Sequence, residues 1–399
     1  MFARRLFNCP NDLKDNKRLK FLQIAVCIGF IGGVLLSHEL WFAWARTFPR
    51  VSMFFEVPVL IDRLLTVILI ISLILINFFE RLKIFSISAI ASLILLIVFD
   101  QLRLQPWVYQ YLLLLILLAL QSENDSNSNQ TLGLSQIIIA GLYFWSGVQK
   151  LNFTFSHETL SLLLAPLQNT FPSFQPPLVL IGVSIAIFES LIGCGLIFRK
   201  TRNLAVCLAV LMHATILAVL IAKDYNRIIW IWNAILMLIV IIVFWKNDGS
   251  IKQTITFSKV INWKVWSAKS IAFASVLLPI LSFVGWSDMY LSGALYSGNT
   301  AVGVIRINED LYGKLPPKAQ QNVFQTKSSG EKMLPLSEWS MSEFNVPAYP
   351  EKRIFKQVAR EVCKLTNDRN NIELIIKERP EILDGIYKVT RISCEQLEQ

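Results

Sequence analysis

The sequence is poor in charge and in the residues that bind metals and nucleotides. Only 17% of its 399 residues are charged, and it has three histidines and six cysteines. It contains no Gly-rich phosphate loop, no Gly-x-Ser-x-Gly motif and no His-Glu-x-x-His motif, and its cysteines lack the spacing of metal ligands. His38 and His157 fall near the predicted ends of apolar stretches, whereas His213 lies deep inside one. These absences argue against a nucleotide site, a serine hydrolase and a metal site.

Hydrophobic sequence, in contrast, is abundant: 54% of the residues are hydrophobic, and the mean hydropathy is +0.51. Apolar stretches of about 17–23 residues fit a hydrocarbon core of about 30 Å. Nine such stretches are found, near residues 20–37, 58–79, 84–99, 107–121, 132–149, 178–198, 204–222, 228–245 and 270–286. The third and fourth are short, and one broken hairpin is the alternative for them. The sequence predicts an all-α polytopic bundle of about nine transmembrane helices, in a bacterial plasma membrane or a thylakoid.

The positive charges are distributed unevenly between the two ends of these stretches. The net charge is +10. The segments predicted to lie on the same side of the membrane as the N-terminus hold sixteen basic residues: Arg4, Arg5, Lys14, Lys17, Arg18, Lys20, Arg81, Lys83, Arg199, Lys200, Arg202, Lys246, Lys252, Lys259, Lys264 and Lys269. The short opposite segments hold six: Arg46, Arg50, Arg103, Lys150, Lys223 and Arg227. Because cytoplasmic loops of membrane proteins are rich in Lys and Arg, we expect a cytoplasmic N-terminus and an extracytoplasmic C-terminus. The basicity therefore reflects topology, and we expect no nucleic-acid partner.

The predicted organisation has three parts: a basic N-terminus (1–19), a membrane bundle (20–286) and a small extracytoplasmic α+β domain (287–399). In the last part, Ala301–Ile307, Asn371–Lys377 and Tyr387–Cys394 resemble strands. A helix is expected from about Pro350, because proline favours the first helical position and apolar residues follow at helical spacing.

The tail contains only two cysteines, Cys363 and Cys394. An even number of cysteines in an extracytoplasmic domain favours a disulfide, and two buried thiols are the alternative.

A longer outer segment, residues 150–177, is apolar and aromatic but is interrupted by four prolines. It is too broken to cross a membrane. We expect an amphipathic flap or a re-entrant stretch on the outer face.

Lys150 lies at the outer edge of the fifth stretch, in the sequence Tyr143-Phe-Trp-Ser-Gly-Val-Gln-Lys-Leu-Asn152. A lysine at membrane depth costs roughly 3 kcal/mol on insertion scales. It is either an interface anchor whose ammonium extends outwards, with Trp145 and Tyr143 in an aromatic belt, or a base whose pKa is lowered by desolvation.

Two further ionisable residues lie near the middle of predicted spans, Glu189 in the sixth and His213 in the seventh. Intramembrane carboxylates usually have a function and a partner, and His213 or a basic residue from another helix is the partner we expect. A structural hydrogen bond between two helices is the alternative. Asp62 with Arg63, and Asp100 with Arg103, are read as neutralising structural pairs.

From Tyr143 to about Lys246 the order of features resembles the HTTM family, which includes the membrane domain of vitamin K-dependent γ-carboxylase. Family members carry an aromatic-small-Gly-x-x-Lys-Leu-Asn/Asp-x-x-Trp motif. Residues 143–152 match this motif up to the Asn, but Phe155 stands where the motif has its final Trp. An acidic residue in the next helix and a mid-span histidine after it correspond to Glu189 and His213. The Ser-Gly-x-x-Lys-Leu element is also similar to DoxX-like membrane proteins.

The resemblance implies a membrane enzyme that deprotonates a lipid-soluble, quinol-like molecule, with a quinone or quinol as the bound compound. Lys150 would be the catalytic base, and Glu189 and His213 would orient groups or relay protons. Trp145, Asn152 and His157 are the substrate-binding candidates. The alternative is a non-catalytic membrane anchor or assembly factor whose tail binds a protein partner.

Overall fold

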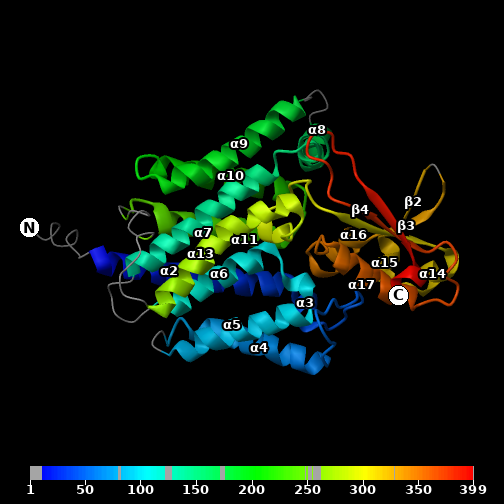
Figure 1. Ribbon diagram of the computed structural model, residues 1–399, viewed down its shortest axis with the longest axis horizontal. Helices are drawn as coiled ribbons and strands as arrows, with labels where there is room; N and C mark the ends of the chain where they lie inside the picture. Colours follow the sequence, from blue (N-terminus) through cyan, green and yellow to red (C-terminus); the bar gives the residue numbers. More distant parts are fainter. Residues whose placement is uncertain are drawn as a thin grey trace, which may run out of the picture.

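The computed structural model describes residues 11–79, 82–121, 128–170, 176–247, 249, 254, 262–327 and 329–398. It consists of a helical bundle and a small domain built on a sheet, which lies at one end of the bundle (Figure 1). The described N-terminal end of the chain lies at the opposite end of the bundle from the sheet.

Each of the nine apolar stretches forms a helix. The helices are α2 (Asn11–Leu36), α4 (Val59–Leu75), α5 (Lys83–Phe99), α6 (Pro106–Leu120), α7 (Ser128–Gln149), α9 (Leu178–Ile197), α10 (Arg202–Ala222), α11 (Arg227–Phe244) and α13 (Trp263–Leu281). Among the described residues, six helices (α2, α7, α9, α10, α11 and α13) are long and apolar enough to cross a membrane. The helices α4, α5 and α6 are apolar but have only 17, 17 and 15 residues.

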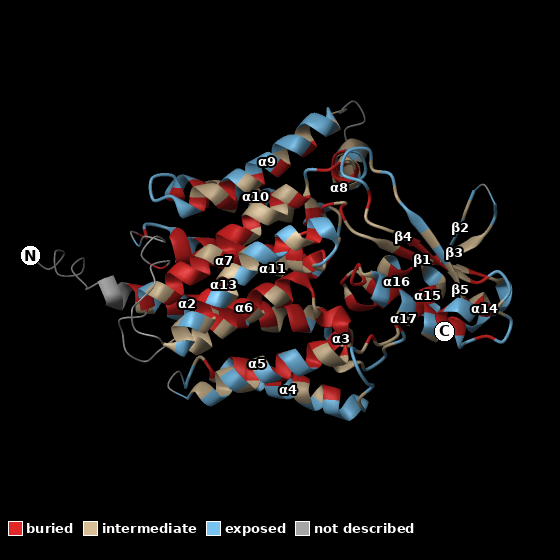
Figure 2. Ribbon diagram, viewed as in Figure 1, coloured by how far each residue is buried: buried red, intermediate tan, exposed pale blue. Residues whose placement is uncertain are grey.

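The surface of the bundle is compatible with lipid contact. Figure 2 shows that buried residues concentrate on α2, α6 and α7, whereas α4, α5, α9 and α10 carry many exposed residues. The exposed side chains on these outer helices are mostly large and apolar, such as Leu60, Ile84, Leu191 and Leu211. A continuous apolar outer surface of this extent is typical of a membrane protein rather than a soluble one.

Short elements close the end of the bundle that faces the sheet. They are α3 (His38–Phe42), η1 (Gln101–Arg103), the π-helix η3 (Phe155–Thr159), α8 (Leu160–Thr170), η4 (Ser282–Val284) and η5 (Tyr290–Ser292). In Figure 1, α8 is seen end-on beside the end of α9, so it runs across the direction of α7 and α9. The predicted outer flap therefore contains η3 and α8, and its residues 171–175 lie outside the described part.

Buried charges at this end of the bundle are paired, but the pairing predicted from neighbours in sequence is wrong. Asp62 binds Arg103 through two hydrogen bonds of 2.7 and 2.6 Å, and both side chains are buried. Asp100 pairs with Arg46. Arg63 instead donates to the carbonyl of Phe42, because that carbonyl lies at the end of a short helix and needs a donor.

The tail contains a five-stranded antiparallel sheet in the order β2-β3-β1-β4-β5. The strands are β1 (Val302–Ile307), β2 (Phe324–Gln325), β3 (Lys332–Pro335), β4 (Glu373–Lys377) and β5 (Val389–Ser393). The helices are α14 (Glu309–Lys314), α15 (Pro317–Gln321), α16 (Leu336–Phe344), α17 (Lys352–Cys363) and α18 (Cys394–Glu398). Helix α17 packs on the sheet where the Phe355 ring approaches Gly303, at which a Cβ would lie 2.5 Å from the ring.

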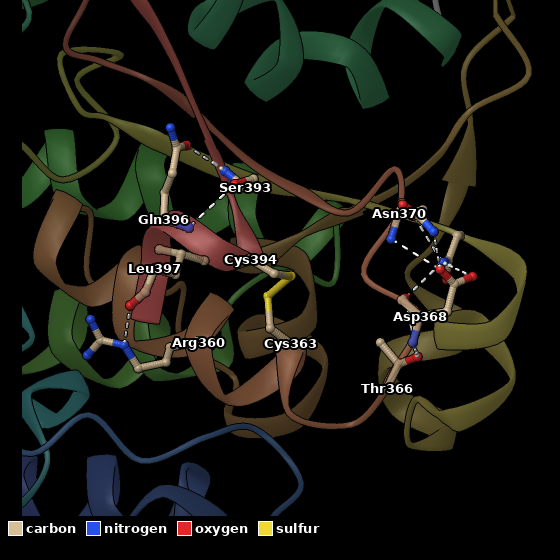
Figure 3. Close-up of a disulfide and its surroundings, with 10 residues drawn as sticks. Arg360, Cys363, Thr366, Asp368, Asn370, Ser393, Cys394, Gln396 and Leu397 are labelled. Carbon is tan, nitrogen blue, oxygen red and sulfur yellow. Dashed lines mark hydrogen bonds between the residues drawn. A yellow bond between two sulfur atoms is a disulfide. The ribbon is translucent and has the colours of Figure 1, made fainter. Parts of the chain in front are cut away.

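The predicted disulfide is confirmed. Cys363, the last residue of α17, is bonded to Cys394, the first residue of α18, with their Cα atoms 5.8 Å apart (Figure 3). Next to it, Arg360 donates a 2.7 Å hydrogen bond to the carbonyl of Leu397. The C-terminal helix is therefore attached to α17 by both a covalent bond and a charged donor.

Polar side chains join the tail to the bundle. Asn299 donates a 2.7 Å hydrogen bond to the side chain of Gln149 at the end of α7, and Arg379 donates a 2.6 Å bond to the Asn299 side-chain oxygen. Arg353 of α17 donates to the side chain of Gln101 in η1. The tail domain therefore has a fixed position on the bundle.

Candidate functional site

Small residues bring α7 and α9 into close contact. A Cβ added at Gly147 of α7 would lie 2.5 Å from the carbonyl oxygen of Ala186 in α9. A Cβ added at Gly193 of α9 would lie 2.6 Å from the backbone nitrogen of Phe144 in α7. Any larger side chain at either glycine would push the helices apart, so this packing sets the spacing of the polar residues beside it.

Lys150 and Glu189 form an ion pair across this contact. Lys150 Nζ lies 2.7 Å from Glu189 Oε2, and the two side chains are 12% and 9% exposed. Nζ also donates to the backbone oxygen and the hydroxyl of Ser146, at 3.1 and 2.7 Å. Ser146 lies one turn earlier on α7, so the ammonium turns back along the helix rather than extending past its end. An interface anchor would place the ammonium in the opposite direction.

A second polar chain crosses the bundle from the same helix. The Tyr143 hydroxyl lies 2.5 Å from His213 Nε2, and His213 Nδ1 lies 2.6 Å from Asn233 Oδ1. Asn233 Nδ2 donates to the carbonyl of Ile229, which fixes the amide so that its oxygen faces the histidine. Because an amide oxygen only accepts, Nδ1 carries the proton, and Nε2 of the neutral ring accepts from the tyrosine.

The two chains are neighbours because Tyr143 and Lys150 are seven residues apart, which places both on one face of α7. The structure thus joins Lys150 directly to Glu189 of α9, and it connects His213 of α10 to α7 through Tyr143. Tyr143 and Asn233 complete the group and were not predicted as site residues; Asn233 was recognisable as a lone amide within the apolar helix α11.

Trp145 lies on a different face of α7 from Lys150. Its Nε1 donates a 2.7 Å hydrogen bond to the carbonyl of Val276 in α13, and its ring contacts Phe283 at a centroid distance of 6.3 Å. Trp145 also lines a small pocket between α6, α7, α13 and η5.

Asn152 is used for local structure. Its side-chain oxygen accepts from the backbone nitrogen of Phe155 at 2.8 Å, and its nitrogen donates to the carbonyls of Gln149 and Ser297 at 2.8 Å. Asn152 therefore caps the helical turn that leads into η3 and holds the tail, and its amide donates to two carbonyls. His157 is exposed on η3 and stacks on Phe153 at a centroid distance of 3.7 Å.

A second pocket lies between the end of α2, α3 and α16. Neither of these two pockets is lined by Lys150, Glu189 or His213. Across the described ranges, no group of three or more His, Cys, Asp and Glu side chains is arranged to hold a metal ion.

Comparison of the chain with models of protein families, with curated proteins and with solved structures found no match. The similarity to the HTTM family therefore rests on residues 143–152 and on the order of the features that follow them.

Proposed function

We propose that this protein is an integral membrane protein of the HTTM type that acts on a lipid-soluble, quinol-like molecule, with Lys150 as the base. The ion pair between Lys150 and Glu189 is the observation that supports this proposal. It places a lysine at the contact between α7 and α9, turned back along α7, with a carboxylate beside it. His213 and Tyr143 provide a second group that can accept and donate protons.

The chemistry needs an unprotonated amine. In the proposed step, the shared proton moves from Lys150 to Glu189, which gives a neutral amine beside a neutral acid. The amine can then accept the proton of a substrate hydroxyl, which leaves an ammonium next to the substrate oxyanion. Glu189 holds the first proton during this step, so no proton has to come from water.

The proposed topology has nine spans, with the N-terminus in the cytoplasm and the tail outside. At 1.5 Å per residue, the helices α4, α5 and α6 have lengths of roughly 22–26 Å, less than a hydrocarbon core of about 30 Å. Their ends towards the tail continue into buried segments such as η1, and irregular backbone is tolerated at membrane depth where protein covers it. A reporter fused after Gln399 tests this topology, and activity of the reporter in the cytoplasm would refute it.

Substitution of Lys150 by arginine tests the catalytic role. Arginine keeps the charge and the long stem but remains protonated at any physiological pH, so it cannot act as a base. We expect Lys150→Arg and Lys150→Ala to lose function in a complementation assay while membrane levels stay normal. Lys223 at the outer end of α10 is the matched control, since its ammonium donates to a backbone carbonyl of α8 on an exposed surface. Lys223→Arg should retain function, and full activity of Lys150→Arg would return Lys150 to a structural role.

Mass spectrometry of the purified protein identifies the compound. We expect a quinone-like lipid to copurify with the native protein and with Lys223→Arg, and to be reduced in Lys150→Ala. Its absence from all three proteins would argue against the lipid-soluble substrate.

The alternative is a non-catalytic anchor or assembly factor with a tail that binds a protein partner. The low exposure of Lys150 and Glu189 favours it, because a closed ion pair also serves to join two helices. Replacing Lys150 and Glu189 together distinguishes the catalytic function from the non-catalytic one.

A further inference from the structure

The connection between β4 and β5, residues 378–388, carries exposed apolar side chains. Leu383 is 91% exposed, Ile386 61% and Ile382 38%. Isolated apolar residues on a surface are ordinary, but three within five residues form a patch.

Backbone hydrogen bonds hold this connection in one conformation. Gly385 donates to the carbonyl of Glu381 at 3.0 Å, and Glu381 donates to the carbonyl of Ile386 at 2.9 Å. Asp384 accepts from the backbone nitrogen of Ile386 at 2.9 Å. The exposed leucine is therefore fixed at the tip of an ordered turn.

The turn is attached to the end of the bundle. The backbone nitrogen of Phe153 donates a 2.9 Å hydrogen bond to the carbonyl of Ile382, and Gly385 lies against the Phe153 ring. Gly385 has a φ of +70°, and a Cβ there would lie 2.6 Å from the ring, so both conformation and space require glycine. Phe153 follows Lys150 by three residues, so the turn lies level with the end of α7.

Apolar surface continues from the turn to the helices around it. In Figure 1 the red segment before β5 reaches α8, which lies across the end of α9. Leu162 of α8 and Leu180 at the start of α9 are both largely exposed. The turn thus extends the apolar outer surface of the bundle at the level where membrane-crossing helices end.

We propose that this turn inserts into the lipid bilayer, with Leu383 and Ile386 in the outer part of the acyl chains. An apolar side chain that would otherwise face water gains by entering lipid. Because the turn carries the acidic side chains Glu381 and Asp384, anionic lipid would not attract it. We therefore expect apolar contact to drive insertion, without a requirement for anionic lipid. The partner of this surface is a neutral lipid bilayer.

The test uses a fluorophore on a single cysteine in nanodiscs that each hold one copy of the full chain. All thiols outside the disulfide are replaced by alanine, and NBD is attached to Leu383→Cys or, as a second position, Ile386→Cys. The control is Phe324→Cys on β2, which is 50% exposed and lies in the sheet away from the bundle in Figure 1. The discs contain phosphatidylcholine with or without a nitroxide near the top of the acyl chain.

We expect the nitroxide lipid to quench the label at Leu383 and Ile386 by about half or more, and to leave the label at Phe324 unchanged. Unquenched labels at both turn positions would overturn the proposal. If they changed emission only when a second copy or another protein was added, the patch would be a protein-binding surface, which also overturns it.

Discussion

The pair formed by Lys150 and Glu189 is best examined by replacing its members singly and together. Glu189→Gln keeps the shape of the side chain and removes its charge, leaving the ammonium with neutral acceptors only, among them the oxygen and hydroxyl of Ser146. Removing one partner of a buried ion pair costs about 3–5 kcal/mol, because an uncompensated charge remains. A neutral hydrogen bond between membrane helices contributes only about 0.6 kcal/mol.

We therefore expect Glu189→Gln to lower the free energy of unfolding by about 3 kcal/mol or more. Lys150→Met should cost less, since the remaining carboxyl group can take up a proton. The combined Lys150→Met and Glu189→Leu variant should recover most of this stability, because apolar residues of similar volume replace a buried pair with little or no loss. The coupling energy is the difference between the summed changes in unfolding free energy of the two single variants and the change measured for the double variant.

The assay is reversible unfolding of the purified protein in bicelles, monitored by helical circular dichroism, with the Lys223→Arg protein as the control. A coupling energy below about 0.5 kcal/mol would refute the ion pair, since contacting charges in a shared site couple more strongly. A stable double variant that complements a deletion strain would instead refute the catalytic proposal. Stability recovered without function is the expected result.

Three further predictions concern other parts of the chain. Asp62→Asn should destabilise the bundle by about 3–5 kcal/mol in the same unfolding assay, because the guanidinium of Arg103 remains buried without its carboxylate. Replacing Cys363 and Cys394 by serine should lower the free energy of unfolding of the tail by about 3.7 kcal/mol, the value for closing a loop with a sequence separation of 31 residues. An unchanged midpoint of urea unfolding would contradict this prediction. A lysine partner lowers the pKa of Glu378 below its ordinary value of 4.5. The charged Glu378 side chain therefore stabilises the tail above pH 4.5, and this contribution is lost as the pH falls through the folded-state pKa. Glu378→Gln should reduce the acid sensitivity of tail unfolding. An identical pH profile of the two proteins would contradict this prediction.

The elements of the fold that depend on local pattern were predictable. Nine apolar stretches gave nine helices, because hydrophobic length is a property of each segment alone. The helix that ends at Cys363 and the strands β1, β4 and β5 followed from periodicity in the same way. The strands β2 and β3 were missed because they contain only two and four residues and are stabilised by pairing with distant partners.

Pairing between helices was harder to predict. The sequence left His213 and a basic residue of another helix as possible partners of Glu189, and the structure shows that the basic residue is Lys150. The pairs of Asp62 and Asp100 were assigned to neighbours in sequence, whereas each carboxylate binds an arginine from another segment. Which arginine lies nearby is decided by how the helices pack, and a single sequence does not contain that information.

The buried ion pairs Arg103–Asp62 and Lys150–Glu189 also differ in chemistry, and the difference bears on their roles. Arg103 is permanently charged, and it binds Asp62 with two parallel hydrogen bonds while donating to two backbone carbonyls as well. That arrangement fixes both the geometry and the charge. Lys150 binds Glu189 through one contact, and its proton can leave. A site that only joins helices gains from a permanently charged arginine held by two hydrogen bonds, whereas a site that moves protons needs a side chain that can lose its proton. In the proposed function, the lysine at the contact between α7 and α9 supplies the acid–base chemistry.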